Sequence, residues 1–314
     1  MAHGGEGYIY RFEHKIDEFP HMFILKLYNN RSKAAKRNAK VKAMFNHPNK
    51  SSDENTRFCW PMGLVYDART FEFYGFAMQE AFKESRDLDI LSAYHVNESI
   101  ADHYPSDTRW HGTFELETPQ GLRNRLFILY RWACAIKELH EQGGIVLGDI
   151  NPHNVLCTPD GKISVVDIDS MQYTVEGHTY MSGAHTAEYC PSEVMKNPAK
   201  MFKLTPQYDS FSFAVSAYTI LTGTHPYGNI INLPPYDGEK YNRISEMIRA
   251  GLYLRGEKKE YLQTVSGFNL HANFDKLPVT LQNIFNRTFN GVMAEYPTME
   301  EWSYILKESH DALL

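Results

Sequence analysis

The chain has 314 residues, of which 43% are hydrophobic and 22% are charged, and this composition is typical of an ordinary globular protein. Its net charge of −6 comes from 32 basic and 38 acidic residues, so the basic excess that broad nucleic-acid binding requires is missing. The longest apolar run, 211–221, is interrupted by Ser and Thr and is shorter than the roughly 20 residues of a membrane-spanning helix.

The cysteines indicate a reducing compartment. They are far apart and show no paired spacing of the kind that zinc sites or secreted disulfide frameworks use. The four are Cys59, Cys134, Cys157 and Cys190. The N-terminus also has no apolar signal-peptide segment. We therefore expect reduced thiols, no membrane association and a cytoplasmic protein.

A glycine cluster opens the chain. Gly4, Gly5 and Gly7 run directly into an alternating stretch that contains Ile9, and a second apolar strand follows at 22–28 with Lys26 as its only charge. A glycine-rich hairpin can place backbone N–H groups over phosphates, and a lysine from a nearby strand can reach the same phosphates. This arrangement predicts a phosphate-binding unit.

Residues 32–46 are predicted to form a helix, with alanines at helical spacing and Ser32 as its N-cap. The helix carries a run of basic residues, which we expect to be a solvated face rather than a binding patch. These residues are Lys33, Lys36, Arg37, Lys40 and Lys42. Two strands, 59–66 and 71–78, follow across a turn at 67–70 and complete a small, mostly antiparallel lobe.

The second part of the chain is mostly helical. A clear helical period runs over 122–140 and ends at a pair of glycines, and further helices are expected at 209–223, 242–249, 277–289 and 299–310. The stretch 172–186 has no strong periodicity and is predicted to be a long loop.

The most informative segment lies at 146–170. Asp149 is followed five residues later by Asn154, then by a tight turn, an apolar strand and Asp167. An aspartate in such a loop can accept the proton of an attacking hydroxyl, and amide and carboxylate oxygens can hold Mg²⁺ against nucleotide phosphates. This is the layout of a phosphoryl-transfer site.

These motifs, in this order and from about Gly4 to Leu306, resemble the protein kinase family. The residues within these motifs are similar to those of a bacterial and phage branch of the family. Some members of that branch carry a helix-hairpin-helix module after the kinase domain, and the sequence ends before such a module. The resemblance implies a bilobal α+β fold, with a β-rich nucleotide-binding lobe at 1–80 and a mainly helical lobe at 81–314. It also makes 172–186 an activation segment and Asp209 a brace for the catalytic loop.

The resemblance further implies that the chain uses ATP and Mg²⁺ and phosphorylates a protein substrate. Lys26 would contact the α- and β-phosphates, Asp149 would be the catalytic base, and Asn151 stands where kinases usually have a catalytic lysine. Asn154 and Asp167 would bind Mg²⁺, and Asp169 would either join them or lie in solvent. The remaining nucleotide-binding positions would be Gly4, Gly5, Gly7, Ile9, Met78, Gln79 and Ala81. Thr186 fits the substrate-facing threonine of serine/threonine kinases.

Three departures from the family pattern keep other functions open. No acid occurs between Glu18 and Asp53, so the usual helix glutamate that pairs with the strand lysine is absent, and Asn38 or a neighbour aligns with it. Asn151 removes a positive charge, and Gly148 replaces the arginine that would bind a phosphorylated activation segment. The sequence therefore favours an active serine/threonine kinase but also allows a pseudokinase or a kinase-fold enzyme acting on a small molecule.

Overall fold

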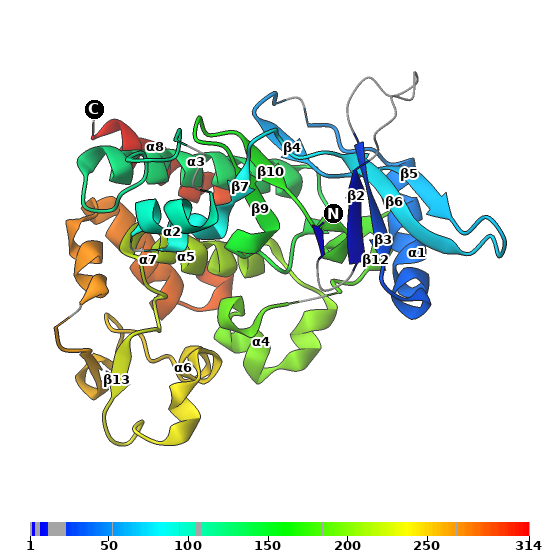
Figure 1. The fold of residues 1–314 in the computed structure, drawn as a ribbon. Helices are drawn as coiled ribbons and strands as arrows, with labels where there is room; N and C mark the ends of the chain where they lie inside the picture. The colour runs from blue at the N-terminus through cyan, green and yellow to red at the C-terminus, as the bar shows by residue number, and fades with distance from the viewer. Residues whose placement is uncertain are drawn as a thin grey trace.

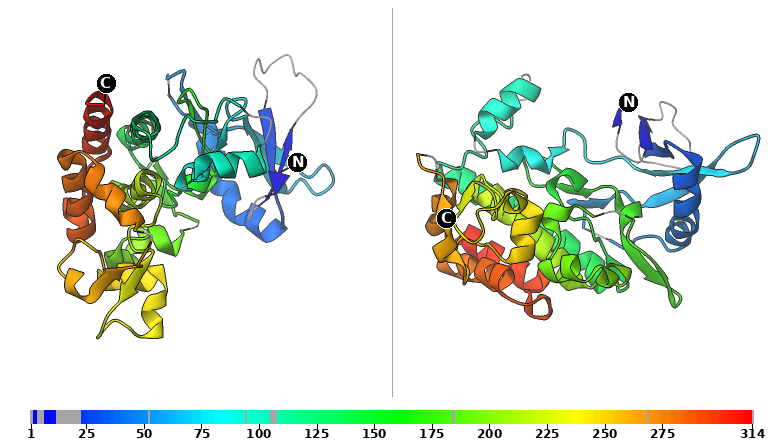
Figure 2. Two further views of the ribbon diagram at one scale, coloured as in Figure 1. Left: turned by 60° about the vertical axis from the view of Figure 1, so that its left-hand side comes forward. Right: turned by 90° about the horizontal axis from the view of Figure 1, so that it is seen from below.

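The computed structural model describes residues 2–3, 7–11, 23–51, 53–93, 95–104, 108–183, 185–267 and 269–313. The chain folds into two lobes (Figures 1 and 2). A smaller lobe, blue to light blue, is built on a sheet, and a larger lobe, green to red, is mainly helical. The predicted bilobal α+β architecture is confirmed.

The small lobe is a five-stranded sheet with the order β1-β2-β3-β6-β5, and all its pairings are antiparallel. The strands are β1 (Ala2–His3), β2 (Gly7–Arg11), β3 (Phe23–Tyr28), β5 (Pro61–Tyr66) and β6 (Phe73–Gln79). Lys26 lies at the centre of β3, opposite Ile9 on β2 and Phe76 on β6. The register thus fixes Lys26 in the middle of the sheet.

One helix, α1 (Arg31–Asn46), accompanies this sheet. Its N-cap is Asn30, whose side chain accepts a hydrogen bond from the backbone N–H of Lys33, so the prediction of Ser32 as N-cap is wrong. The expectation of a solvated basic face is also wrong for Arg37 and Lys40, which are only 8% and 4% exposed. The inner face of α1 is therefore basic.

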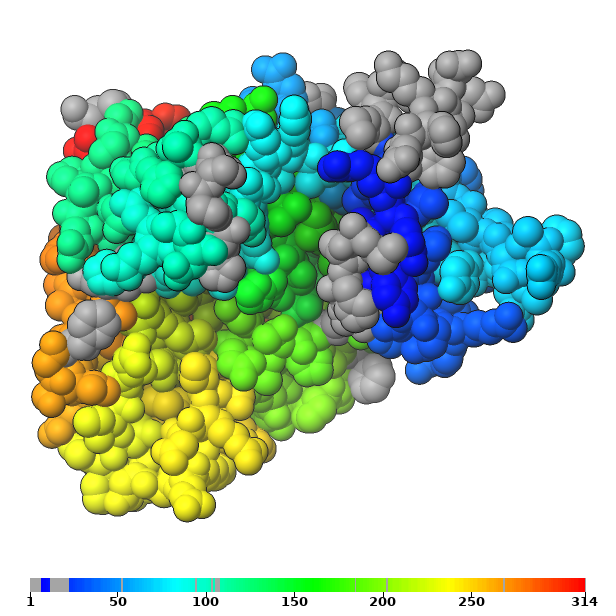
Figure 3. Space-filling view, in the orientation of Figure 1, coloured from blue at the N-terminus to red at the C-terminus, as the bar shows by residue number. Residues whose placement is uncertain are grey.

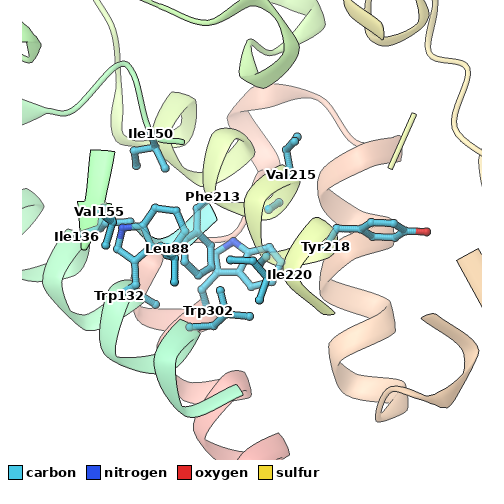
Figure 4. Packing of buried hydrophobic residues seen from close by; sticks show 14 of the residues in the cluster. Leu88, Trp132, Ile136, Ile150, Val155, Phe213, Val215, Tyr218, Ile220 and Trp302 are labelled. Carbon is cyan, nitrogen blue, oxygen red and sulfur yellow. The ribbon is translucent and has the colours of Figure 1, made fainter. Parts of the chain in front are cut away.

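The large lobe is organised around α3 and α5. Its helices are α2 (Val96–His103), α3 (Pro119–Glu141), α4 (Ser192–Lys196), α5 (Pro206–Thr222), α6 (Ile244–Ala250), α7 (Val279–Asn290) and α8 (Met299–Asp311). The ring of Phe213 on α5 lies edge-on to Trp132 of α3 and Trp302 of α8, with centroids 5.2 and 5.4 Å away (Figure 4). These rings join α3, α5 and α8 in the core of the large lobe. No helix in the described part of the chain has the length and apolar character needed to cross a bilayer.

Short strands and 3₁₀ helices connect these parts. The strands are β4 (Thr56–Phe58), β7 (Arg86–Asp87), β8 (Ile145–Val146), β9 (Val155–Cys157), β10 (Ile163–Val165), β11 (Gln172–Val175), β12 (His178–Tyr180), β13 (Ile230–Asn232) and β14 (Leu262–Thr264). The 3₁₀ helices are η1 (Leu88–Ser92), η2 (Pro152–Asn154), η3 (Ile168–Ser170), η4 (Ala187–Tyr189), η5 (Pro198–Phe202), η6 (Glu239–Asn242), η7 (Lys259–Tyr261), η8 (Leu270–Lys276) and η9 (Met293–Glu295).

Two of the sheets position the site. In the order β4-β10-β9-β7, β4 comes from the chain between α1 and β5 and pairs in parallel with β10. In the order β12-β11-β8, part of the expected loop 172–186 forms a hairpin. Glu176 and Gly177 form the two-residue turn of this hairpin. Their φ angles of 51° and 77° are both positive, as in the type I′ turns that commonly join two antiparallel strands. The prediction of an irregular loop is wrong for this part of the segment.

Candidate active site

A cleft of about 1600 Å³ runs between the lobes. Figure 3 shows green segments of the large lobe between the blue small lobe and the cyan chain that follows it. The residues that line the cleft include Gly7, Ile9, Ile24, Lys26, Met78, Ala81, Asp149, Asn154, Leu156, Val166 and Asp167. Gly4 and Gly5 lie outside the described residues, and Gln79 is not among the lining residues of the cleft.

The catalytic loop is held from below by Asp209, as predicted. This carboxylate, at the start of α5, is fully buried. It accepts hydrogen bonds of 2.8 Å from the backbone N–H groups of Leu147 and Gly148 and lies 2.8 Å from Nε2 of His140 on α3. These bonds fix the backbone immediately before Asp149.

Asp149 is hydrogen-bonded both within its own loop and to the end of the 172–186 segment. Its Oδ1 accepts a hydrogen bond of 2.9 Å from Oγ1 of Thr186, and its backbone oxygen accepts one of 2.9 Å from Nδ2 of Asn154. The side chain of Asn154 thus donates through its nitrogen, so its oxygen is the atom that could hold a metal. The structure therefore brings Asp149, Asn154 and Thr186 together.

Asn151 is engaged in the fold of the loop itself. Its Oδ1 accepts a hydrogen bond of 3.0 Å from the backbone N–H of His153, and its Nδ2 lies 3.3 Å from the backbone oxygen of Asp149. The residue is only 6% exposed and does not line the large cleft. Asn151 therefore caps η2, and its catalytic role stays a prediction without a contact that supports it.

Asp167 and Lys26 meet across the lobes. Asp167 follows β10 in a left-handed conformation, with φ of 56°, and its carboxylate forms an ion pair with Nζ of Lys26. The carboxylate remains 32% exposed and lines the cleft, whereas the Lys26 side chain is 5% exposed. Burial alone would lower the pKa of Lys26, but the charges of Asp169 and Asp167 raise it above its usual value. Lys26 is therefore held in its charged form.

Asp169 does not lie in solvent. Its side chain is 0% exposed, its Oδ1 is 2.6 Å from Nζ of Lys26, and its Oδ2 accepts a hydrogen bond of 2.7 Å from the hydroxyl of Tyr28. Burial alone would raise the pKa of Asp169, but Lys26 and Tyr28 together lower it. Of the two roles expected for Asp169, solvation is wrong, and metal binding has no free oxygen to support it.

The inner face of α1 reaches the segment after Asp167. Nζ of Lys40 donates to the backbone oxygens of Met171 and Met181, at 2.6 and 2.7 Å, and thereby joins the two ends of the β11–β12 hairpin. Asn38, which aligns with the usual helix glutamate, has a buried Oδ1 with no hydrogen-bond partner in the described part of the chain. Helix α1 therefore contacts the activation segment by a cation and offers no carboxylate to Lys26.

Gly148 has a structural reason for lacking a side chain. Its φ is +72°, and a Cβ at this position would lie 2.8 Å from both Oγ of Ser182 and Cδ1 of Leu204. An arginine here would collide with the activation segment. The segment is instead fixed by Gln172, whose amide forms two hydrogen bonds with the backbone of Leu204, at 2.8 and 2.9 Å.

The residues of the cleft fit Mg²⁺ and a nucleotide. Asn154 and Asp167 provide oxygen ligands, and Mg²⁺ is commonly held by few side chains together with phosphate oxygens and water. The described residues contain no cluster of three or more His, Cys, Asp or Glu side chains able to hold a metal by themselves. Ile9, Ile24 and Met78 offer apolar surface for a flat ring.

Comparison with known proteins agrees with this geometry. The family model described as protein kinase domain matches residues 76–267. The Escherichia coli K12 protein named Protein kinase YegI is 24% identical over 306 residues, which cover 96% of this chain and 42% of that protein. The G protein-coupled receptor kinase 2 of Drosophila melanogaster is 30% identical over 114 residues, which are 36% of this chain and 14% of the relative. The chain thus spans less than half the length of these relatives.

Proposed function

The chain belongs to the protein kinase family, and on this premise we propose that it transfers the γ-phosphate of ATP, with Mg²⁺, to serine or threonine hydroxyls of a protein substrate. The observation that carries the proposal is the convergence of Lys26, Asp149, Asn154 and Asp167 on one cleft. A lysine, a base and two oxygen ligands for the metal are the groups that a kinase contributes to phosphoryl transfer.

Each residue has a defined part in this proposal. When bound, ATP would supply the transferable phosphoryl group and Mg²⁺ would neutralise the charge of its phosphates. Asp149 accepts the proton of the acceptor hydroxyl, and Lys26 binds the α- and β-phosphates. Asn154 and Asp167 would hold the metal. Because phosphoryl transfer depends on positioning and charge, the bonds that fix Asp149 matter as much as its own acidity.

The preference for serine and threonine is supported by Thr186. Its hydroxyl donates to Oδ1 of Asp149 at 2.9 Å, which ties the end of the activation segment to the base. An aliphatic hydroxyl of a substrate is a close chemical match for this contact. We therefore propose that the substrate hydroxyl approaches Asp149 beside Thr186.

A second candidate, a pseudokinase that binds nucleotide without useful turnover, is favoured by Asn151. Both polar atoms of this amide are engaged within the catalytic loop, so no cation from this position faces the transferred group. Loss of such a charge helper lowers the stabilisation of the transition state.

The test is phosphoryl transfer from γ-labelled ATP, as autophosphorylation and to a generic protein substrate. Wild type is compared with Asp149→Asn, Asp167→Asn and Asp311→Asn, the last an exposed control on α8. We expect wild type and the Asp311 variant to label equally. Asp149→Asn should lose at least about 100-fold, the usual contribution of a general base, and Asp167→Asn should also lose activity because it removes a metal ligand. Equal labelling by all four proteins would refute the kinase proposal.

Nucleotide binding separates the two candidates. A rise in melting temperature with Mg²⁺ and ATP but no labelling above the Asp149→Asn background would establish the pseudokinase. No rise with or without Mg²⁺ would reject both.

A further inference from the structure

The strand lysine of this chain has an unusual set of neighbours. No acid is available from α1, because the helix has no Asp or Glu and its buried positions are Ala34, Arg37, Lys40, Val41 and Met44. The Lys26 side chain is nevertheless almost completely buried, at 5% exposure. A buried ammonium without a partner is strongly destabilising, so its counter-charge has to come from elsewhere in the fold.

The counter-charge comes from the turn that also carries the metal ligand. Asp167 begins η3 in the left-handed conformation, and this turn directs Asp169 back under β3. There Oδ1 of Asp169 meets Nζ of Lys26 at 2.6 Å. Asp167 and Asp169 thus approach Lys26 from one short turn.

Tyr28 completes the arrangement. It lies two residues after Lys26 on the same strand, so both side chains project from the same face of β3. Its hydroxyl donates to Oδ2 of Asp169 at 2.7 Å, and Tyr28 itself is 0% exposed. The two oxygens of Asp169 are therefore each bound by a side chain of β3, which restrains the carboxylate from rotating.

We propose that Asp169 is the positioning residue for Lys26 and replaces the helix glutamate of the protein kinase family. The inference rests on the proposed function, since it concerns how the same site binds phosphate. It assigns Asp169 a role distinct from metal binding: Mg²⁺ usually retains several waters, and Asp169 is 0% exposed, whereas Asp167 is 32% exposed.

This arrangement couples the placement of the strand lysine to the placement of a metal ligand, which in most kinases depend on different elements. In a helix-based pair, movement of the helix can withdraw the glutamate and release the lysine. Here the positions of Lys26 and of the metal ligand Asp167 depend on the same turn, so they form together. The placement of Lys26 is therefore independent of any carboxylate on α1.

The test uses Asp169→Asn, which keeps the shape of the side chain and removes its charge, with Asp311→Asn as the exposed control. The first measurement is the affinity for ATP and for adenosine by calorimetry, because only ATP carries the phosphates that Lys26 contacts. We expect the preference for ATP over adenosine to fall on the order of tenfold, since one charge-assisted contact is weakened. Adenosine affinity should stay the same.

The second measurement is the Mg²⁺ dependence of turnover. Asp169→Asn should lower kcat by about 100-fold, as expected for misplacement of a catalytic group, without changing the Mg²⁺ concentration at half-maximal rate. Asp167→Asn should raise that concentration. A shift of the Mg²⁺ requirement in Asp169→Asn, or an unchanged preference for ATP, would overturn the proposal.

These outcomes are distinguishable from failure of the proposed function. If wild type binds neither ATP nor adenosine, the kinase proposal fails. If it binds both and Asp169→Asn does not alter the ratio, only the positioning role fails. Should Asp169→Asn fold poorly, Tyr28→Phe removes one hydroxyl from Oδ2 of Asp169, and we expect a smaller, several-fold loss of the ATP preference; no loss would again overturn the proposal.

Discussion

Replacement of Asp209 by asparagine tests the brace under the catalytic loop. The carboxylate accepts one backbone N–H at Oδ1, from Gly148, and lies within 2.8 Å of two nitrogens at Oδ2, from Leu147 and His140. An amide has only one oxygen. If its NH₂ takes the place of Oδ1, the N–H of Gly148 is left buried without an acceptor.

The cost follows from these contacts. An unsatisfied buried N–H costs about 1–3 kcal/mol, and each of the other two bonds weakens by about 1 kcal/mol when its acceptor is no longer charged. We therefore expect Asp209→Asn to lower the free energy of unfolding by about 3–5 kcal/mol. For a chain of this size the melting temperature should fall by roughly 6–10 °C. Displacement of the loop that carries Asp149 should also reduce kcat by about 100-fold.

The assays are chemical denaturation and steady-state phosphoryl transfer. His140→Ala is the matched variant, because it removes one side-chain donor to Asp209 and leaves both backbone donors satisfied, at a cost of about 1–2 kcal/mol. A loss below about 1 kcal/mol in Asp209→Asn, or one no larger than that of His140→Ala, would refute the reasoning.

Three further substitutions test the activation segment and its contacts. Lys40→Met removes the donor to the two ends of the β11–β12 hairpin, so hydrogen exchange of the hairpin amides should accelerate; unchanged exchange would contradict the clamp. Thr186→Val removes the bond to Asp149, worth about 1.4 kcal/mol, and should lower kcat about tenfold while Thr186→Ser retains it. Gly148→Ala forces a Cβ into the left-handed region against Ser182, which should cost at least about 1–2 kcal/mol in denaturation; a neutral result would show that the loop relaxes.

The arrangement of the catalytic loop could be predicted from the sequence because its signals are local and ordered. The spacing of Asp149, Asn154 and Asp167 requires only a turn and a strand between them, and the structure brings all three to one cleft. The periodicity of 122–140 likewise predicts α3, although the helix begins earlier, at Pro119, after the capping side chain of Thr118. For this helix the predicted type is confirmed and only its bounds differ.

The environment of the buried charges could not be predicted in this way. In the sequence, Arg37 and Lys40 cannot be distinguished from the residues of a solvated basic helix face. The carbonyl oxygens that bind Lys40 belong to residues more than a hundred positions later in the chain. Asp169 is similar: its burial depends on β3, more than a hundred residues earlier in the chain. Tyr28 was detectable in principle, since it shares a strand face with Lys26.

The hairpin at 172–180 was missed despite a usable signal. Alternating aromatic and β-branched residues flank a two-residue turn that ends in Gly177, and this pattern is typical of a tight hairpin. The resemblance to a kinase activation segment favoured an irregular loop over this local signal.

The pairing of β4 with β10 connects the two lobes at a second place besides the chain that runs between them. Residues of β4 precede the end of the small lobe in sequence, yet the backbone N–H of Cys59 donates to the oxygen of Val165 at 3.0 Å, and Phe58 and Trp60 pack in the core of the large lobe. A fragment cut at residue 80 would leave β10 as an exposed edge with unpaired backbone groups, prone to pair with another chain. We therefore expect the cleft to open by rotation about a line through β4 and residues 78–81, where the chain passes from the small lobe to the large one.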